Sequence, residues 1–449
     1  MNNAVAAVND GNGLDADLTL RKAAEFDRIV DPLKMVNPYV ATRACTRAQQ
    51  PSRASGMQGA LLDWIAGICV IGATLGCIYL AAACVLVLRF AHRRGDDCPG
   101  APPVTILIPL YGAEPRLFER CAAFCRQDYG GTVQLICATH DPTDPAIEVI
   151  KELQAAFPQQ PISVEVEPRG HGPNRKVSNL INMMPLARHD IIVTADSDIE
   201  VGPHHLSALI GELQPPAVGA VTCVYHGMAA AGLWSRLSAL SINTHFLPHA
   251  VAAMALHLAK PCFGATIAMR RETLRRIGGF DAFAGCVADD YMIGQAVRSA
   301  GLTVAVPAFS VGHVCFENDF NSLLRGQLRS ARTIRSIDPL GHAGSILTHP
   351  FPLALLGAVL SGGGAILLSA LVLAGVALGC RAMLVFCVQR AFGLERQDYW
   401  LIPVEELILF AVYVLSFLGA TVTWRGRRYR IASHARLVDI ENRKREQVR

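Results

Sequence analysis

The chain has 449 residues, of which 51% are hydrophobic and 17% are charged. Its formal net charge of +4 lacks the strong basic excess of a nucleic-acid-binding protein, so no nucleic-acid partner is expected. The apolar residues concentrate near residues 60–90, 351–380 and 401–424, and this distribution excludes a wholly soluble protein.

The N-terminal part predicts a tail followed by a membrane anchor. Residues 1–57 are largely polar and rich in alanine, and we expect them to be poorly ordered. Residues 58–91 predict a transmembrane signal-anchor, because residues 64–88 carry no charge and exceed the roughly 20 residues that a helix needs to cross the hydrocarbon. This apolar run begins too far along the chain for a cleaved signal peptide.

Residues 100–340 predict a doubly wound α/β domain. We expect strands at residues 104–109, 133–138, 162–166, 191–195 and 304–314, and helices at residues 117–127, 146–157, 176–184, 204–213 and 289–299. Such alternation is typical of a parallel sheet covered by helices, whose ligands lie beyond the carboxyl ends of the strands. The fourteen cysteines form no Cys-x-x-Cys pair, and we interpret them as small hydrophobic side chains in a reducing compartment.

Residues 345–424 predict a C-terminal transmembrane region, and residues 425–449 predict a basic cytoplasmic tail. Three consecutive glycines at positions 362–364 interrupt the apolar run 351–380, which is therefore either one span plus a re-entrant piece or a broken helix. Residues 401–424 predict a further span. Glu405 and Glu406 lie near its start, where they would cost little at the membrane interface and would mark function if they lay deeper.

The strongest local signal for chemistry is Asp196-Ser-Asp198, directly after the apolar strand 191–195. Two carboxylates at positions i and i+2 of a turn can face one pocket and share a hard divalent cation, which also binds phosphate oxygens. A solvated loop is the alternative explanation, but the position at a strand end favours the metal site.

A second strand, 133–138, is also followed by acidic residues. We expect Asp141 to reach a ribose or base, and Asp144 to cap the helix that begins at Pro145. The loop 170–179 enters a helix with Asn174 as a possible N-cap. Its amides and Lys176 suit a phosphate, although an ordinary capped loop explains the pattern equally well.

Three further positions each have two explanations. Asp289 and Asp290 open a helix, where they either cap it or include a general base with a raised pKa. Arg329 belongs to a group of arginines before the membrane region, which either attracts anionic lipid headgroups or clamps a diphosphate. His313, near the end of the run 304–314, is either structural or a metal ligand.

Seven motifs occur in a sensible order and spacing: Pro109-Leu-Tyr-Gly112, Gln127-Asp-Tyr129, Asp141-x-x-Asp-Pro-Ala146, Asn174-x-Lys176-x-x-Asn-Leu180, Asp196-Ser-Asp198, Gly278-Gly-Phe280 and Ala288-Asp-Asp-Tyr291. In this order they resemble the ceramide glucosyltransferase family, and especially its bacterial branch, the hopanoid-biosynthesis glycosyltransferases. The resemblance covers about residues 58–435.

The resemblance implies a GT-A fold, inverting transfer from a UDP-sugar to a lipid hydroxyl, and Mg²⁺ or Mn²⁺ as cofactor. By position, Asp141 would contact the nucleotide, Asp196 and Asp198 would bind the metal and diphosphate, and Asp290 would be the catalytic base. Lys176 would face the donor. The sugar is N-acetylglucosamine or glucose, and the acceptor is a hopanoid polyol or a ceramide.

The chain departs from the family at its last motif, which is Gln or Arg, two residues, then Arg-Trp. Here Arg329 is present, but Gly326 replaces the first side chain and Ser330 replaces the tryptophan beside the acceptor. A catalytically impaired membrane scaffold is therefore one alternative. A processive polysaccharide synthase would need more spans, and a transporter would rest on Glu405 and Glu406 alone.

Basic residues flank the first and last apolar runs and predict the topology. Arginines follow both runs and favour a cytoplasmic location for the intervening domain, whereas Arg43, Arg47 and Arg53 before the first run favour the opposite. Because a nucleotide-sugar donor is cytosolic, we expect a multi-pass protein of the bacterial inner membrane with its catalytic domain facing the cytoplasm.

Overall fold

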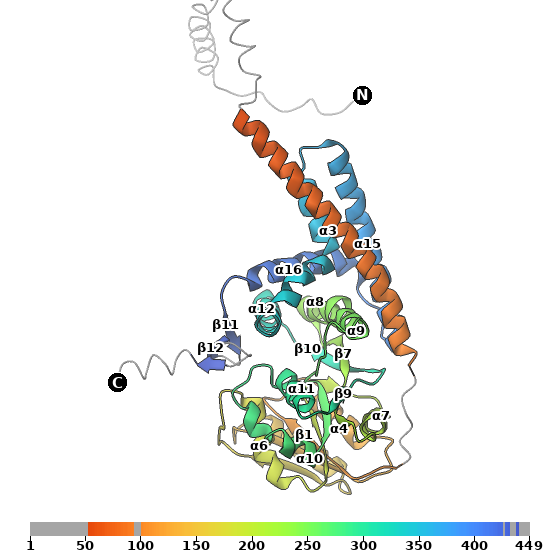
Figure 1. Ribbon diagram of the computed structural model, residues 1–449. Coiled ribbons are helices and arrows are strands. Elements are labelled where there is room, and N and C mark those ends of the chain that lie inside the picture. The colour runs from red at the N-terminus through yellow and green to blue at the C-terminus, as the bar shows by residue number, and fades with distance from the viewer. Residues whose placement is uncertain (1–52, 94–99, 425–426, 432–436, 440–449) are drawn as a thin grey trace, which may run out of the picture. The chain divides into compact units, whose positions relative to one another are not determined.

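The computed structural model describes residues 53–93, 100–424, 427–431 and 437–439 (Figure 1). Residues 1–52 of the expected N-terminal tail 1–57 lie outside the described residues. Most of the expected basic tail 425–449 also lies outside them. Helix α3 (Arg53–Ala91) occupies the predicted anchor, and its part Gln58–Ala91 is long and apolar enough to cross a membrane.

A seven-stranded sheet in the order β3-β2-β1-β4-β8-β6-β9 forms the centre of the domain. Its strands are β1 (Val104–Pro109), β2 (Val133–Thr139), β3 (Ile162–Val166), β4 (Ile191–Ala195), β6 (Val218–Thr222), β8 (Thr266–Arg270) and β9 (Thr303–Ala305). Strands β1 to β4 are parallel, as predicted, but β8 is antiparallel to both β4 and β6. The sheet is therefore mixed. The direction of a strand cannot be deduced from the periodicity of its apolar residues. Strand β8 begins at the edge of the sheet where β4 ends, since Ala195 pairs with Thr266.

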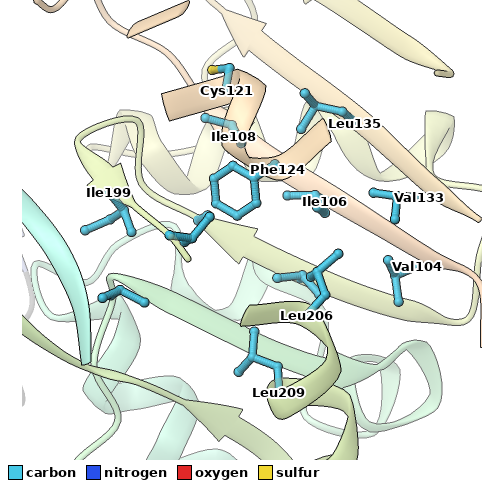
Figure 2. Packing of buried hydrophobic residues seen from close by; sticks show 14 of the residues in the cluster. Val104, Ile106, Ile108, Cys121, Phe124, Val133, Leu135, Ile199, Leu206 and Leu209 are labelled. Carbon is cyan, nitrogen blue, oxygen red and sulfur yellow. The ribbon is translucent and has the colours of Figure 1, made fainter. Parts of the chain in front are cut away.

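Helices cover both faces of the sheet (Figure 1). Alternate residues of β1 separate the two cores: Ile106 and Ile108 pack toward one group of helices, and Leu107 packs toward the other. The first group is α4 (Leu117–Cys125), α5 (Ala146–Ala156) and α7 (His205–Leu213), and the second is α6 (Arg175–Met183), α10 (Arg271–Arg276) and α11 (Asp289–Ser299). In the first core Phe124 lies among buried side chains from β1, β2 and α7 (Figure 2), so truncating it to alanine would cost about 3–5 kcal/mol.

A small second sheet stands beside the carboxyl end of β4. It has the order β5-β10-β7, with β5 (Ile199–Glu200), β7 (Val224–Ala229) and β10 (Ser310–Cys315). The predicted strand 304–314 is thus two strands, β9 and β10, which belong to different sheets. His313 pairs with Ile199, the residue that follows Asp198, and this register brings His313 to the acidic turn.

The C-terminal helices follow the domain: α12 (Phe320–Ile337), α13 (Pro339–Gly344), α14 (Pro350–Leu360), α15 (Gly364–Phe392) and α16 (Ile402–Ser416). The glycines break the run 351–380 as anticipated, since Gly363 and Gly364 have φ values of 111° and 64°. Gly364–Phe392 and Tyr399–Ser416 are also long and apolar enough to cross a membrane, and α13 with α14 forms a pair bent by 72°.

The expected span 401–424 is wrong beyond Ser416. Helix α16 ends there, and residues 421–424 form strand β11 (Thr421–Trp424), which pairs with β12 (Arg427–Ile431); β13 (Leu437–Asp439) completes this third sheet. Apolar composition alone does not distinguish a helix from a β-strand over so few residues. Gly419, with φ 90°, lies between the two elements.

Candidate active site

The acidic turn Asp196-Ser-Asp198 connects β4 to β5 at the carboxyl edge of the sheet. The backbone N–H of Asp196 donates to Ala265 O at 3.2 Å, and the N–H of Ile199 donates back to Asp196 O at 3.3 Å. Arg120 of α4 is almost fully buried and donates from Nε to Ser197 O at 2.6 Å. A buried guanidinium thus fixes the backbone between the two carboxylates.

Lys176 connects this turn to two helix N-termini. Its Nζ lies 2.7 Å from Asp196 Oδ1, 4.0 Å from Asp289 Oδ2 and 3.3 Å from Gly264 O. Burial alone would lower the pKa of Lys176, but Asp196 and Asp289 raise it above its ordinary value. The lysine is therefore a permanent cation at the end of β4.

The N-cap of α6 joins the Lys176 loop to α11. Asn174 accepts from Val177 N at 3.1 Å, as the predicted cap requires, and its amide donates to Asp289 Oδ1 at 3.0 Å. Asp289 is 8% exposed. Asp289 therefore has structural partners in Asn174 and Lys176.

Asp290 faces the site from the first turn of α11. A Cβ atom placed on Gly264 would lie 3.1 Å from Asp290 Oδ2 and 3.3 Å from Lys176 Nζ, so glycine leaves room for both side chains. Burial, followed by the charge of Asp289, raises the pKa of Asp290 to about 6, whereas Lys176 and the N–H of Tyr291 act in the opposite direction. A carboxylate with such a pKa is suited to accept a proton near neutral pH.

Asp198 and His313 form the other side of the site. Asp198 Oδ1 lies 3.4 Å from His313 Nδ1, and among the described residues this buried oxygen has no hydrogen-bond partner. Burial would raise the pKa of Asp198, but His313 brings it below its ordinary value; in return Asp198 raises the pKa of His313 against the effect of burial. A buried carboxylate oxygen that faces an imidazole, accepts no hydrogen bond and follows Asp196 by two residues fits a divalent cation.

The two remaining predicted residues are Arg329 and Asp141. Arg329 on α12 interacts electrostatically with Asp198, Tyr225 and Asp196, although burial lowers its pKa from the ordinary value. Asp141 is exposed at the end of β2, where Thr143 donates to it from N and Oγ1. Strand β1 lies between β2 and β4, so the ends of β2 and β4 are two strand spacings, about 10 Å, apart on the same edge of the sheet. The structure brings Asp141 to this edge, and its hydrogen bonds are to Thr143.

Sequence reasoning missed two residues of the site, Tyr225 and Arg120. The Tyr225 ring on β7 stacks on Phe246, with centroids 4.2 Å apart. Burial raises the pKa of Tyr225, and Asp290, Asp198 and Asp196 raise it further, which places the phenol close to all three acids. No motif surrounds Tyr225, whereas a charged residue within the apolar pattern of the helix 117–127 could have identified Arg120.

A separate polar cluster surrounds Glu405 and Glu406, whose depth the sequence left open. Both glutamates are buried; Thr244 donates to Glu405 Oε1 at 2.7 Å, and Arg381 of α15 pairs with Glu406. His245, His349 and Glu406 could hold a metal by their mutual distances. Arg381, however, already supplies a positive charge to Glu406, so this cluster is a paired ionic network within the helices.

The model of the family described as Glycosyl transferase family 21 matches residues 68–437. The chain belongs to glycosyl transferase family 21. The mixed sheet, with its acidic turn at the end of β4, is the GT-A-like α/β fold of a glycosyltransferase.

Curated relatives of this family 21 chain are ceramide glucosyltransferases. It is 24% identical to ceramide glucosyltransferase 1 of Caenorhabditis elegans over 53% of this chain and 51% of the relative. It is 30% identical to the ceramide glucosyltransferase of Gibberella zeae over 35% of this chain and 34% of the relative. The chain thus matches at most about half the length of these two relatives.

Solved structures of other glycosyltransferases are similar to the family 21 chain at low identity. The mannosyltransferase PcManGT from Pyrobaculum calidifontis, in complex with GDP-Man and Mn²⁺, is 20% identical, with 80% of this chain and 99% of that chain covered and a TM-score of 0.48. Glucosyl-3-phosphoglycerate synthase from Mycobacterium tuberculosis, in complex with Mn²⁺ and UDP-Glc, is 17% identical, with 52% and 78% covered and a TM-score of 0.34.

Proposed function

We propose that the chain transfers a hexose, N-acetylglucosamine or glucose, from a UDP-sugar to a membrane-lipid hydroxyl, with inversion at the anomeric carbon. One observation carries the proposal: Asp290 and Lys176 meet at Gly264, and Lys176 Nζ lies 2.7 Å from Asp196 Oδ1 in the acidic turn. A proton acceptor next to a cation at the carboxyl edge of an α/β sheet is the arrangement that sugar transfer from a nucleotide diphosphate requires.

In the proposed reaction Asp290 accepts the proton of the acceptor hydroxyl. The hydroxyl oxygen forms a bond to the anomeric carbon, and the bond from that carbon to the diphosphate oxygen breaks on the opposite side. Its electron pair stays on UDP. Lys176 and Arg329 would stabilise the charge that grows on the diphosphate, and Asp141 would contact the nucleotide.

Asp198, Asp196 and His313 are the residues that would hold Mg²⁺ or Mn²⁺. When bound, the cation supplies positive charge that favours departure of the diphosphate. The buried Oδ1 of Asp198, which faces His313 and accepts no hydrogen bond among the described residues, supports this assignment.

For the acceptor we favour a hopanoid polyol, because the order and wording of the seven motifs resemble the bacterial hopanoid branch; ceramide is the alternative. Apolar helices on both sides of the domain in sequence support delivery of the acceptor from the bilayer. We place the protein in the bacterial inner membrane with the catalytic domain on the cytoplasmic side, where the donor occurs.

The departures at Gly326 and Ser330 favour a second candidate, an inactive membrane scaffold. Ser330 is exposed on α12 and supplies no aromatic surface, and beyond the backbone of α12 no described atom lies within 4 Å of a Cβ built on Gly326. This candidate predicts a chain that binds UDP but releases none from UDP-sugars.

The test incubates the full chain in detergent and Mn²⁺ with UDP-glucose or UDP-N-acetylglucosamine, each against a hopanoid polyol and a ceramide. Products are identified by mass, with Asp290→Asn as the matched inactive control. We expect one glycolipid and one equivalent of UDP per transfer. Absence of UDP release with every pair, at retained UDP binding, would support the scaffold instead.

A further inference from the structure

A pocket of about 940 Å³ lies where α3 leaves its apolar segment, away from the acidic turn. Four parts of the chain line it: the last turns of α3, Glu212 of α7, the end of α9 (Leu247–Ala255) with the loop that follows, and the chain from the end of α11 to Val306 just after β9. None of the residues proposed to bind the donor or the metal lines this pocket.

The charges around the pocket are unbalanced. Arg89, Arg93, Lys260 and Arg298 line it together with His257, and Glu212 is the one acidic residue among its described lining residues. Such an excess of cations in one concavity attracts an anion and is costly to maintain without one.

Arg298 gives the clearest sign of a ligand. Both terminal nitrogens of its guanidinium are buried, and neither has a hydrogen-bond partner among the described residues. Arg298 lies in the last turn of α11, where the helix dipole favours a cation, but the dipole does not satisfy the N–H groups of these two nitrogens. Because these two nitrogens have almost no accessible surface, the Arg298 side chain would have to rotate toward the pocket before its guanidinium could bind a phosphate in a bidentate manner.

The rest of the lining is apolar and indicates what the phosphate is attached to. Leu86, Phe90, Met254 and Val306 contribute hydrophobic surface to the same pocket. Arg89 is in the last turn of α3, so the basic rim lies at the end of a helix that is apolar enough to cross the bilayer. Basic side chains at the end of a membrane-spanning helix lie near the phosphates of the lipid headgroups. Apolar side chains beside them can pack against the glycerol and the first acyl carbons of the lipid.

We propose that this pocket binds the phosphate headgroup of an anionic phospholipid, with Arg298 and Lys260 as the principal phosphate contacts. The ligand would fix the end of α3 against the α9 and α11 ends of the domain. This lipid site is separate from the site proposed for sugar transfer, and the proposal does not depend on which lipid is the sugar acceptor.

The test uses the full chain in neutral detergent and measures bound lipid by native mass spectrometry, with phosphatidylglycerol and phosphatidylcholine as the two probes and no sugar donor. We expect the wild-type chain to retain phosphatidylglycerol preferentially. Arg298→Gln and Lys260→Gln should each weaken that binding about fivefold, the effect of removing one cation near a lipid phosphate. Lys260 is exposed, so its variant gives the result even if Arg298→Gln folds poorly.

Arg390→Gln is the matched control, because Arg390 is an exposed arginine in the last turn of α15 that does not line the pocket. Its helix ends close to the end of α3, since the ring centroids of Phe392 and Phe90 are 6.2 Å apart. Equal losses with Arg390→Gln and Lys260→Gln would show diffuse attraction and overturn the proposal. Displacement of the lipid by millimolar glycerol phosphate or inorganic phosphate would show a soluble anion site and also overturn it.

Discussion

Lys176 Nζ lies 2.7 Å from Asp196 Oδ1, although one residue begins α6 and the other follows β4. The same ammonium is 4.0 Å from Asp289 Oδ2 and close to Asp290. One cation is thus shared among three carboxylates that come from two places in the chain. The charged groups at the end of β4 are therefore paired with one another in the absence of a donor.

Replacing Lys176 with methionine should weaken donor binding. The variant keeps the aliphatic stem but removes the charge next to Asp196, so the proposed diphosphate site loses its fixed cation. We expect the Kd of UDP, measured by calorimetry with Mn²⁺, to rise about tenfold or more, since hydrogen bonds to charged groups contribute about 1.5–3 kcal/mol.

Lys151→Met is the control for this variant. Lys151 is exposed on α5 and pairs with Glu148 one turn away, at 2.7 Å. Its replacement should leave UDP affinity unchanged. Unchanged affinity in Lys176→Met as well would remove Lys176 from the proposed donor site.

Asp290 should control the pH dependence of transfer. Because burial and Asp289 raise its pKa to about 6, the proton-accepting form is lost as the pH falls through 6. The value of kcat/KM should then fall about tenfold for each further pH unit. Asp290→Asn should abolish transfer and keep UDP binding; normal turnover by that variant would refute the proposed role.

The same carboxylate has a predictable effect on stability. A raised folded-state pKa means that the folded protein holds the Asp290 proton more tightly than the unfolded chain, so ionisation destabilises the fold above about pH 6. Asp290→Asn should therefore have a higher Tm than the wild type at pH 7.5. The difference should shrink between pH 6 and 4, where the wild-type carboxyl is protonated in the fold.

Asp141 and Asp144 provide a matched pair with opposite expectations. Asp144 is buried and accepts from Gly112 N, Thr139 Oγ1 and Ala146 N. Asp144→Ala should lower the free energy of unfolding by about 2–4 kcal/mol, because it leaves buried donors unpaired. Asp141→Ala removes only exposed contacts to Thr143, so it should leave the melting temperature nearly unchanged and weaken UDP binding. The reverse pattern would exchange the roles of the two residues.

Much of the parallel half of the domain could be predicted, because it consists of local patterns. The strands β1 to β4 and the cap Asn174 follow from apolar runs and from the residue types at helix starts. The direction of β8, and the separation of β9 from β10, depend on which strands pair across long sequence distances, and one sequence does not reveal this.

The site shows the same limit. The ordered motifs predicted Lys176, Asp196, Asp198 and Asp290 as site residues, and these residues lie near one another in the structure. Tyr225 reaches the acids only because β7 pairs with β10, and Arg120 only because α4 packs next to the acidic turn. The sequence also did not distinguish Asp289 from Asp290. In the structure Asn174, at the start of another helix, donates a hydrogen bond to Asp289.

The placement of α16 gives a prediction about topology. Asp398, just before this helix, pairs with Arg236 of α8 (Gly232–Ser241), and after its end Leu418 O and Thr421 O accept from Arg332 of α12 at 2.9 and 2.6 Å. Arg335 of α12 also donates, to Gly419 O at 2.6 Å. Both ends of α16 are therefore bonded to helices that belong to the described domain region. We expect α16 to lie along that region and not to cross the bilayer, although its composition would permit crossing.

Reporter fusions after Gly393 and after Gly419 test this directly, since the two positions bracket α16. A cytoplasmically active reporter, such as a fluorescent protein, and a reporter active only outside the cytoplasm should give the same side for both positions. The α14–α15 hairpin would then bring the chain back to the side of the domain. At its turn, Gly362 N donates to Asp63 Oδ1 at 2.7 Å, near the start of α3. At its end, the ring centroids of Phe392 and Phe90 are 6.2 Å apart, near the end of α3. Opposite sides for the two fusions would make α16 a true span and would place the C-terminal tail across the membrane from the proposed catalytic site.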